Sequence, residues 1–177
     1  IGGGTTDVVV IALGGVAART SLACAGHSMD EAIVQHVRKH HNLLIGDRTA
    51  EQLKIVVGSA LPITTPTRVE VKGRHVGQGL PTTVSVTDFD IQIALEGTVR
   101  QIVQAVRETL ERTPPELSAD ISDQGIVLNG GGSLLEGFDD RITRDTGVPA
   151  RWTADPLGSV VLGAGRMLEN LDLLKKW

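Results

Sequence analysis

The sequence holds a single cysteine, Cys24, so no disulfide can form within the chain. Disulfides belong to oxidising compartments, so a reducing cytoplasm is the expected location, and Cys24 is expected to be a small buried residue. Long apolar runs are also missing. The longest, Val8–Ala18, is interrupted by Gly14-Gly15 and followed by Arg19, whereas a membrane-spanning helix needs about 20 apolar residues. No such helix is predicted.

Basic residues are few enough to leave a net charge of −4, and they form no stripe along the chain. This composition argues against a dedicated nucleic-acid binder. With 41% hydrophobic and 21% charged residues, the chain is typical of a globular protein. No cleavable signal is visible. The sequence begins at Ile1, inside a strand-like segment, and we therefore expect it to start within a longer protein.

Several catalytic and binding motifs are absent as well. The sequence contains no GxxxxGK[ST] loop and no GxGxxG opening a helix after a strand, so neither a P-loop nor a dinucleotide fold is predicted. No Ser/His/Asp or Cys/His set has local support, and no general base stands near a candidate site. The residues predict binding more strongly than chemistry.

Four histidines, His27, His36, His40 and His41, raise the possibility of a metal site, since His36 and His40 are four residues apart. No carboxylate or cysteine accompanies them at a matching spacing. Histidines at a helix end also complement the helix dipole. No metal site is predicted.

Two glycine triplets are the most informative feature present. Gly2-Gly3-Gly4 precedes Thr5 and Thr6, and Gly130-Gly131-Gly132 precedes Ser133; each triplet adjoins an apolar, strand-like run. Glycine lets backbone N–H groups approach a ligand and form an anion site. Each turn alone could be merely structural, a ligand-free hairpin or a tight turn with Ser133 as N-cap. Together they suggest a split nucleotide site.

Glu51 and Lys54 lie three residues apart on one predicted helix face. They could hold a ribose hydroxyl or flank an adenine. The alternative is an exposed ion pair, which contributes about 0.2–0.5 kcal/mol. The residues by themselves favour the ion pair.

Hydrophobic periodicity predicts a mixture of strands and helices. Segments 8–13 and 16–22 form a predicted hairpin with a Gly14-Gly15 turn, and 68–72 and 84–86 a two-stranded ribbon. Another strand covers 126–128. Helices are predicted over 30–40, from Thr49 to Gly58, over 88–112, after Ser133 to Gly147, and from Asp155-Pro156 through Leu171 to the basic end Lys175-Lys176.

Capping boxes of the S/T-x-x-E/Q type supply three predicted helix starts, at Ser28, Thr49 and Ser133. Thr113-Pro114-Pro115 is expected to end the long helix, because the residue before a proline disfavours the helical conformation. The outer segments, 1–27 and 91–177, mix strands with core-type helices, whereas 28–90 is smaller and more polar. An α/β domain with an inserted α+β subdomain is therefore predicted.

Several segments resemble a known family. Ile1–Asp7 resembles the second phosphate-binding hairpin of the actin-like ATPases, and Leu128–Ser133 resembles their adenosine-binding turn. Four further segments resemble the MreB family of rod shape-determining proteins, which are bacterial homologues of actin, more closely. They occur in the order of that family and at similar spacings: Ala25–Ile33, Ile45–Glu51, Thr113–Leu117 and Gly163–Gly165. The resemblance covers essentially the whole chain and the C-terminal half of the family.

The resemblance implies an actin-like ATPase (ribonuclease H-like) lobe, with 1–27 and 91–177 as the large IIA-like subdomain and 28–90 as the inserted IIB-like one. It implies ATP and Mg²⁺ as ligands and self-association into filaments. It also implies partners among cell-wall elongation proteins, and a place at the inner face of the plasma membrane, where filaments guide wall synthesis and determine rod shape. Membrane contact would come from the N-terminal half.

Site residues follow from the resemblance by position. Gly2, Gly3 and Gly4 would hold the β- and γ-phosphates, and Gly26 would lie near the ribose. Thr5 or Thr6 would place the attacking water. The adenosine would be lined by Glu51, Gln52, Leu53 and Lys54, and the base and α-phosphate would be covered by Gly130, Gly131, Gly132 and Ser133.

The chain departs from the family pattern at two positions: His27 stands where an acidic residue is usual, and Asn129 where threonine is common. The family's metal-organising aspartate precedes the hairpin, and Ile1 begins just after it. The first phosphate loop and the catalytic carboxylate belong to the other half. Whether this chain is an ATPase is therefore left open. Alternatives are a small-molecule kinase of the same fold, a chaperone relative, and an inactive truncated fragment.

Overall fold

The computed structural model describes residues 1–169 of the chain. Its elements, in order, are β1 (Thr6–Ala12), β2 (Gly15–Leu22), α1 (Gly26–His41), β3 (Leu43–Leu44), α2 (Asp47–Val57), β4 (Arg68–His75), β5 (Pro81–Thr87), α3 (Asp88–Glu111), α4 (Pro115–Gln124), β6 (Ile126–Leu128), the 3₁₀-helix η1 (Gly131–Leu134), α5 (Phe138–Thr146), β7 (Ala150–Trp152) and α6 (Ser159–Glu169). Leu171 and Lys175-Lys176, predicted for the last helix, lie outside the described residues.

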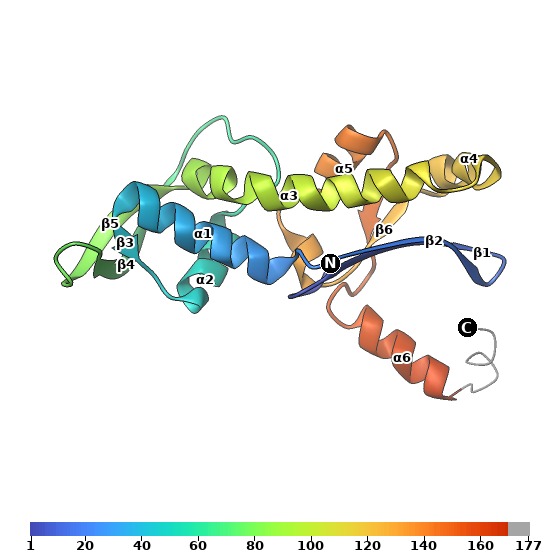
Figure 1. Ribbon diagram of the computed structural model, residues 1–177, viewed down its shortest axis with the longest axis horizontal. Coiled ribbons are helices and arrows are strands. Elements are labelled where there is room, and N and C mark those ends of the chain that lie inside the picture. Colours follow the sequence, from blue (N-terminus) through green and yellow to red (C-terminus); the bar gives the residue numbers. More distant parts are fainter. Residues whose placement is uncertain (170–177) are drawn as a thin grey trace.

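The long helix α3 runs through most of the length of the molecule (Figure 1). It packs against α1, α2 and β5 and, farther along, against the β1–β2 hairpin and α5. Its predicted apolar stripe is confirmed, since all of the following side chains are buried: Ile91, Leu95, Val99, Ile102, Val103 and Val106. The predicted end at the Thr-Pro-Pro segment is also confirmed.

Three separate sheets are present in the described part of the chain. β1 and β2 form the predicted antiparallel hairpin. Its turn consists of Leu13 and Gly14, both with positive φ, because Gly15 already pairs with Ala12; the prediction of a Gly14-Gly15 turn was wrong by one residue. β6 pairs in parallel with β7. β3 joins β4 and β5, so the predicted two-stranded ribbon is a three-stranded sheet.

The three predicted capping boxes were wrong, and backbone contacts explain the first two. α1 begins at Gly26, before Ser28, because the N–H groups of Gly26 and His27 donate to the carbonyls of the Gly2–Gly3 turn. α2 begins at Asp47, before Thr49, and the carbonyl of Gly46 accepts the N–H groups of Thr49 and Ala50. The helix starts are therefore set by neighbouring backbone and not by hydroxyl side chains.

At the third box, Ser133 lies inside the 3₁₀-helix η1, and its hydroxyl donates to the Gly130 carbonyl at 2.7 Å. α5 begins only after Gly137, because the positive φ of Gly137 is incompatible with a right-handed helix. The structure has one capping box that the sequence reading missed: the Thr87 hydroxyl accepts the Asp90 N–H, and the Asp90 carboxylate accepts the Thr87 N–H. It opens α3.

α4 and β7 were also missed. α4 is polar and has no buried residue, and β7 is three residues long, so neither has a readable pattern. The last helix was predicted from Asp155, and Asp155 does accept the Gly158 N–H, although α6 itself begins at Ser159. α6 stands away from the rest of the molecule (Figure 1) and buries none of its residues.

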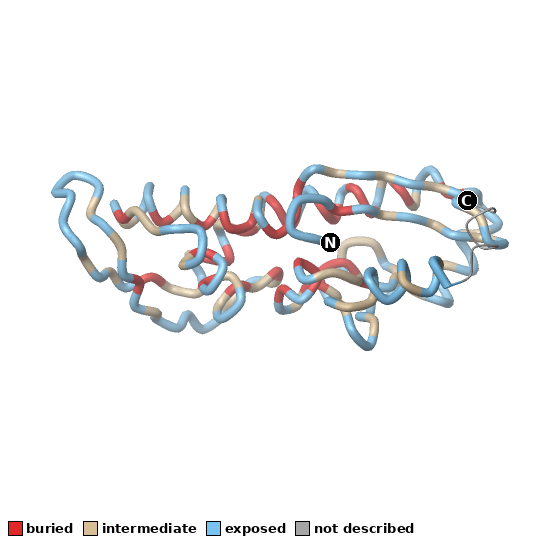
Figure 2. The backbone as a smooth tube through the Cα atoms, turned by 90° about the horizontal axis from the view of Figure 1, so that it is seen from below, coloured by how far each residue is buried: buried red, intermediate tan, exposed pale blue. Residues whose placement is uncertain are grey.

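The buried residues form a core that follows the helices and the inner faces of the sheets, as the red segments of Figure 2 show. Cys24 is buried within it, as expected. Fully enclosed members include Met29, Ile33, Val37, Leu43, Ile91, Leu95, Phe138 and Ile142.

Among the described helices, none combines the length and the apolar character that a bilayer crossing requires. The division at residues 28–90 stays a prediction.

Candidate functional site

A cavity of about 430 Å³ opens where the first glycine turn meets α1, α2 and the 3₁₀-helix η1. Its size is within the range of small-molecule sites. Its lining comes from segments far apart in the sequence: Gly2, Gly3, Gly26, His27, Asp30, Glu51, Lys54, Ile55, Gly131, Gly132, Leu134, Leu135 and Leu157. Both glycine triplets therefore contribute to one cavity.

The first glycine turn is held against the start of α1. Gly2 N–H donates to the Thr5 carbonyl at 2.9 Å, and the carbonyls of Gly2 and Gly3 accept the first N–H groups of α1 at 3.0 and 2.7 Å. Within residues 1–169, the N–H groups of Gly3 and Gly4 donate no hydrogen bond. A turn with free N–H groups beside a helix N-terminus favours an anion.

The second glycine turn is joined to the first through Ile1. The Ile1 amino group donates to the Asn129 carbonyl at 2.7 Å, and Gly132 N–H donates to the Ile1 carbonyl at 3.0 Å. A Cβ at Gly130, where φ is +84°, would lie 2.3 Å from the Ile1 carbonyl oxygen. Glycine is therefore required at this position for two reasons, the positive φ and the close backbone approach.

Lys54 is the cation of the cavity. Its Nζ lies 2.8 Å from Asp30 Oδ1 and donates to the Gly26 carbonyl at 3.1 Å, and only 14% of the Lys54 side chain is exposed. No ion pair joins Lys54 to Glu51 in the described part of the chain. The interpretation of Glu51 and Lys54 as an exposed ion pair was therefore wrong. Lys54 ties α2 to the N-terminal half of α1.

Half of the predicted site residues line this cavity: Gly2, Gly3, Gly26, Glu51, Lys54, Gly131 and Gly132. The others do not line it: Gly4, Thr5, Thr6, Gln52, Leu53, Gly130 and Ser133. Leu53 belongs to the hydrophobic core, Gln52 is exposed, and Ser133 is fully buried. Gly130 acts through the backbone, because it lets the second turn approach Ile1.

The two threonines predicted to place a water have different environments. The Thr6 hydroxyl is buried and donates to the Cys24 carbonyl at 2.7 Å, so it faces away from the cavity. Thr5 is exposed, and its hydroxyl lies 3.4 Å from Asp7. The geometry favours Thr5 over Thr6, and the catalytic role of either stays a prediction.

The sequence reading missed six lining residues: His27, Asp30, Ile55, Leu134, Leu135 and Leu157. Asp30 has no local signal, because its partner Lys54 is 24 residues away. Ile55 and Leu157 are exposed apolar side chains, with 72% and 71% of their surface accessible. They provide apolar walls on which a flat ring can lie. The sequence shows only that Ile55 directly follows Lys54 and that Leu157 directly precedes Gly158.

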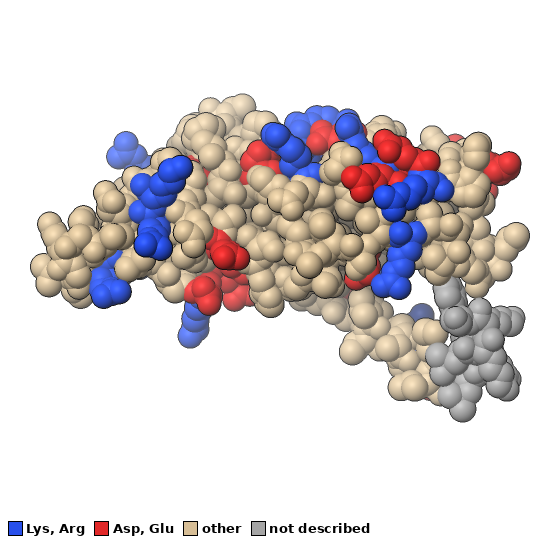
Figure 3. All heavy atoms as spheres, viewed as in Figure 1, with Lys and Arg blue, Asp and Glu red and all other residues tan. Residues whose placement is uncertain are grey.

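The residues around the cavity are suited to binding a ligand. Free backbone N–H groups and one lysine can hold an anion, and apolar walls can hold a ring. Of the two carboxylates that line the cavity, Asp30 is buried, is paired with Lys54 and is not free to act as a base. Elsewhere on the surface, basic and acidic side chains are interspersed on the face that Figure 3 shows. Ion pairs at the surface of the described residues include Arg100 with Glu96 and Arg112 with Glu108.

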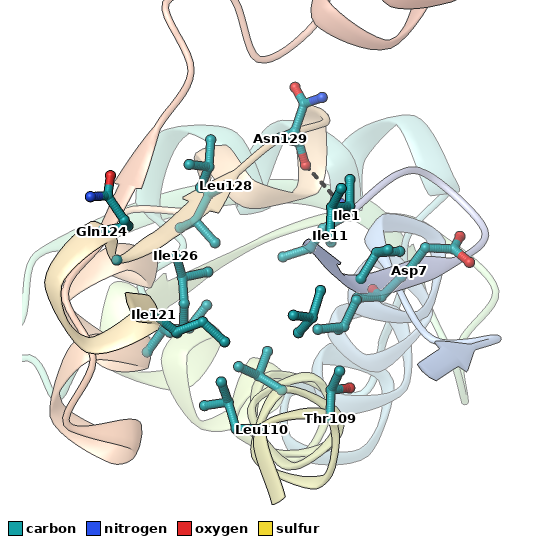
Figure 4. A pocket seen from close by; sticks show the side chains of 18 of the residues that line it. Ile1, Asp7, Ile11, Thr109, Leu110, Ile121, Gln124, Ile126, Leu128 and Asn129 are labelled. Atoms are coloured by element: carbon teal, nitrogen blue, oxygen red, sulfur yellow. Dashed lines mark hydrogen bonds between the residues drawn. The ribbon is translucent and has the colours of Figure 1, made fainter. Parts of the chain in front are cut away.

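A second cavity, of about 520 Å³, lies between β1 and β6 above α3 (Figure 4). Its walls are largely apolar and include Val8, Val10, Ile102, Val106, Leu110 and Ile126. Asp7 and Asp120 are the ionisable side chains at its edge, and Asp7 is paired with Arg19. In the described residues β1 pairs with β2 alone and β6 with β7 alone. The larger cavity is therefore a gap between two strand edges.

Comparison with known sequences shows a match along nearly the whole chain. Residues 1–176 match the family described as MreB/Mbl protein. The chain is 42% identical over 176 residues to the cell shape-determining protein Mbl of Bacillus subtilis, covering 99% of this chain and 53% of that protein. It is 43% identical over 173 residues to the cell shape-determining protein MreB of Escherichia coli, covering 98% and 50%. The chain thus spans about half the length of these relatives.

Solved structures of the same fold agree. MreB5 of Spiroplasma citri bound to AMPPNP superimposes with a TM-score of 0.90 at 32% identity, covering 97% of this chain and 52% of that one. The MamK double helical filament superimposes with a TM-score of 0.78 at 25% identity, covering 96% and 53%. The expected fold, an actin-like α/β lobe, is confirmed.

Proposed function

Because this chain belongs to the MreB/Mbl protein family, we propose that it is part of an ATP-binding bacterial cytoskeletal protein that assembles into filaments and determines cell shape. One observation carries the proposal: two glycine turns, far apart in the sequence, meet at one cavity that also holds Lys54. The structurally similar MreB5 binds AMPPNP and ADP in its solved structures.

The residues fit an adenine nucleotide. Gly3 offers a free N–H group to the phosphates beside the N-terminus of α1, and Lys54 adds a positive charge. Gly4, next to the lining residues, would add a second free N–H group. The ribose would lie near Gly26, and the adenine between Glu51 and the second glycine turn, against Ile55 and Leu157. We include Mg²⁺ as the counter-ion of the bound ATP and assign it no side chain of residues 1–169.

Filament formation is the second part of the proposal. MamK, of similar fold, forms a double helical filament. Here α6 and the strand β1 present exposed apolar side chains: Val9, Ile11, Val160, Val161, Leu162 and Leu168. Exposed apolar patches of this kind mark protein contacts. In the whole protein we propose nucleotide-dependent self-association at the inner face of the plasma membrane, together with cell-wall elongation proteins. Thr5 would help to place the attacking water.

A small-molecule kinase is the alternative in another functional class. Such an enzyme needs a positioned base beside the phosphates, and the described cavity offers Asp30 in an ion pair and an exposed Glu51. Measured transfer of a phosphoryl group from ATP to a small acceptor would support this alternative. An inactive fragment would bind no nucleotide while still folding.

Calorimetric titration of the 177-residue chain with Mg-ATP tests the binding site. We expect saturable binding that Gly131→Val abolishes, because a Cβ at Gly131 projects to 3.1 Å from Leu157 inside the cavity, and φ is not positive there. Gly97→Val is the matched control, since its Cβ meets nothing within 4 Å. Failure of the folded wild-type chain to bind Mg-ATP would overturn the proposal for this chain.

A further inference from the structure

A cluster of histidines and a carboxylate lies away from the residues that line the nucleotide cavity. His36 and His41 lie in the second half of α1, and Asp90 lies in the first turn of α3. One potential ligand atom from each of the three residues lies within 4.8 Å of the other two. The Nε2 of His41 is 3.6 Å from Asp90 Oδ2, and the Nε2 of His36 is 3.9 Å from Asp90 Oδ1.

Both imidazole nitrogens are buried without a partner. The Nε2 atoms of His36 and His41 each expose less than 1 Å² and make no hydrogen bond to any described residue. Their distances to the Asp90 carboxylate are longer than a hydrogen bond allows. Buried polar atoms of native proteins almost always have a partner, so two such nitrogens facing one carboxylate indicate a missing ligand.

We propose that His36, His41 and Asp90 bind a zinc ion. Two imidazoles and one carboxylate with an open fourth position form a donor set that Zn²⁺ favours. Zinc–ligand bonds of about 2.0–2.2 Å place tetrahedral ligand atoms about 3.4 Å apart. The present separations require a contraction of roughly 1 Å or less at each ligand, which rotation of the partly exposed side chains can supply.

Neighbouring side chains orient the ligands. The N–H and hydroxyl of Thr87 donate to Asp90 Oδ2 at 2.9 and 2.7 Å. The His36 ring stacks on that of His40 with the centroids 4.4 Å apart. Such outer contacts fix the direction of metal ligands. A bound ion would tie the C-terminal end of α1 to the N-terminal end of α3.

Titration of the metal-free 177-residue chain with Zn²⁺, followed by calorimetry, tests the proposal. We expect one high-affinity site per chain and a rise in the melting temperature on saturation. His36→Gln and His41→Gln should each weaken Zn²⁺ binding at least tenfold. His75→Gln is the matched control, because His75 lies in β4 and does not belong to the cluster; it should change the affinity less than threefold.

Co²⁺ provides an independent readout, since four-coordinate Co²⁺ with nitrogen and oxygen ligands gives a visible absorption band. The band should appear in the wild type and in His75→Gln and be lost in the His36→Gln, His41→Gln double variant. Circular dichroism on each variant confirms that the fold is kept. A wild-type chain that binds no Zn²⁺, or a double variant that binds it as tightly as the wild type, overturns the proposal. Neither result bears on ATP binding, because the two sites share no residue.

Discussion

The two ends of α3 differ in how completely they are covered. Near its start, Ile91 and Leu95 are fully buried where the helix packs with α1, α2 and β5. Farther along, Ile102, Val106 and Leu110 line the cavity of about 520 Å³ between β1 and β6. The apolar stripe is continuous along the helix, so the sequence pattern is the same at both ends. Periodicity therefore marks the face that is to be covered, and only the tertiary structure shows how fully it is covered.

The polar contacts of α3 are also unevenly distributed. Its first turn carries the Thr87–Asp90 capping box and the His36–His41–Asp90 cluster. Near its middle, Glu96 pairs with the buried Arg141 of α5. Arg107, in the later part, is exposed and donates to the Asp145 carbonyl. The later part also has the buried Thr109, whose hydroxyl donates to the Ala105 carbonyl at 2.8 Å. Buried polar groups are thus paired in both parts, since an unpaired group would be costly.

Truncating one apolar side chain at each end should have the largest effect. Ile91→Ala removes a fully buried side chain from the closed part of the core, and we expect a loss of about 4 kcal/mol in the free energy of unfolding. Leu110→Ala should cost about 2 kcal/mol, because the side chain is only partly buried, borders the cavity and loses fewer contacts. Urea unfolding followed by circular dichroism measures both. Equal losses would remove the distinction between the two ends.

Arg141 should contribute next. Its guanidinium donates to both Glu96 carboxylate oxygens at 2.8 and 2.9 Å and to the Ala60 carbonyl at 3.0 Å, with 7% of the side chain exposed. Arg141→Met leaves Glu96 and the Ala60 carbonyl without this partner, and we expect a loss of about 2–3 kcal/mol. Arg100→Met is the control, since Arg100 contacts the same carboxylate from an exposed position and should cost at most about 0.5 kcal/mol. A similar loss in both variants would show that burial does not matter here.

The same pair predicts a pH dependence. Hydrogen bonds from Arg141 hold the pKa of Glu96 below its ordinary value, despite the opposing effect of burial. A carboxylate whose pKa is lower in the folded state stabilises the fold above its unfolded pKa, and this contribution disappears as the pH falls through the folded pKa. Between pH 7 and pH 3 the wild type should therefore lose more stability than Arg141→Met. The urea midpoints of both variants across this pH range test the prediction. If the midpoints of the wild type and of Arg141→Met fall in parallel, the Glu96 carboxylate does not cause the loss of stability.

The capping box should give the smallest of these effects. Thr87→Ala removes the hydroxyl that accepts the Asp90 N–H, and we expect a loss of about 1 kcal/mol. Thr83→Ala, at an exposed position of β5, is the control and should change stability by less than about 0.5 kcal/mol. Thermal unfolding of both variants measures the difference. If Thr87→Ala matches the control, the cap does not stabilise the start of α3.

Particular elements show why part of the fold could be predicted. The stripe of α3 and the alternation of β4 and β5 are local patterns long enough to be read. β3 has two residues and α4 buries none, so neither pattern was available. The predicted capping boxes failed because hydroxyl–acid spacings are common, whereas the start of α1 depends on carbonyls of the distant Gly2–Gly3 turn.

The candidate site divides in the same way. The sequence by itself determined the two glycine triplets, the residues of α2 beside them and the family resemblance, because flexible backbone and charge are properties of single residues and short segments. Only the tertiary structure decided that Ile1 bonds to both sides of the second triplet, that Lys54 pairs with Asp30 and that Asp90 faces two histidines. These contacts join residues 24 to 131 positions apart, and their geometry depends on packing that no local pattern encodes.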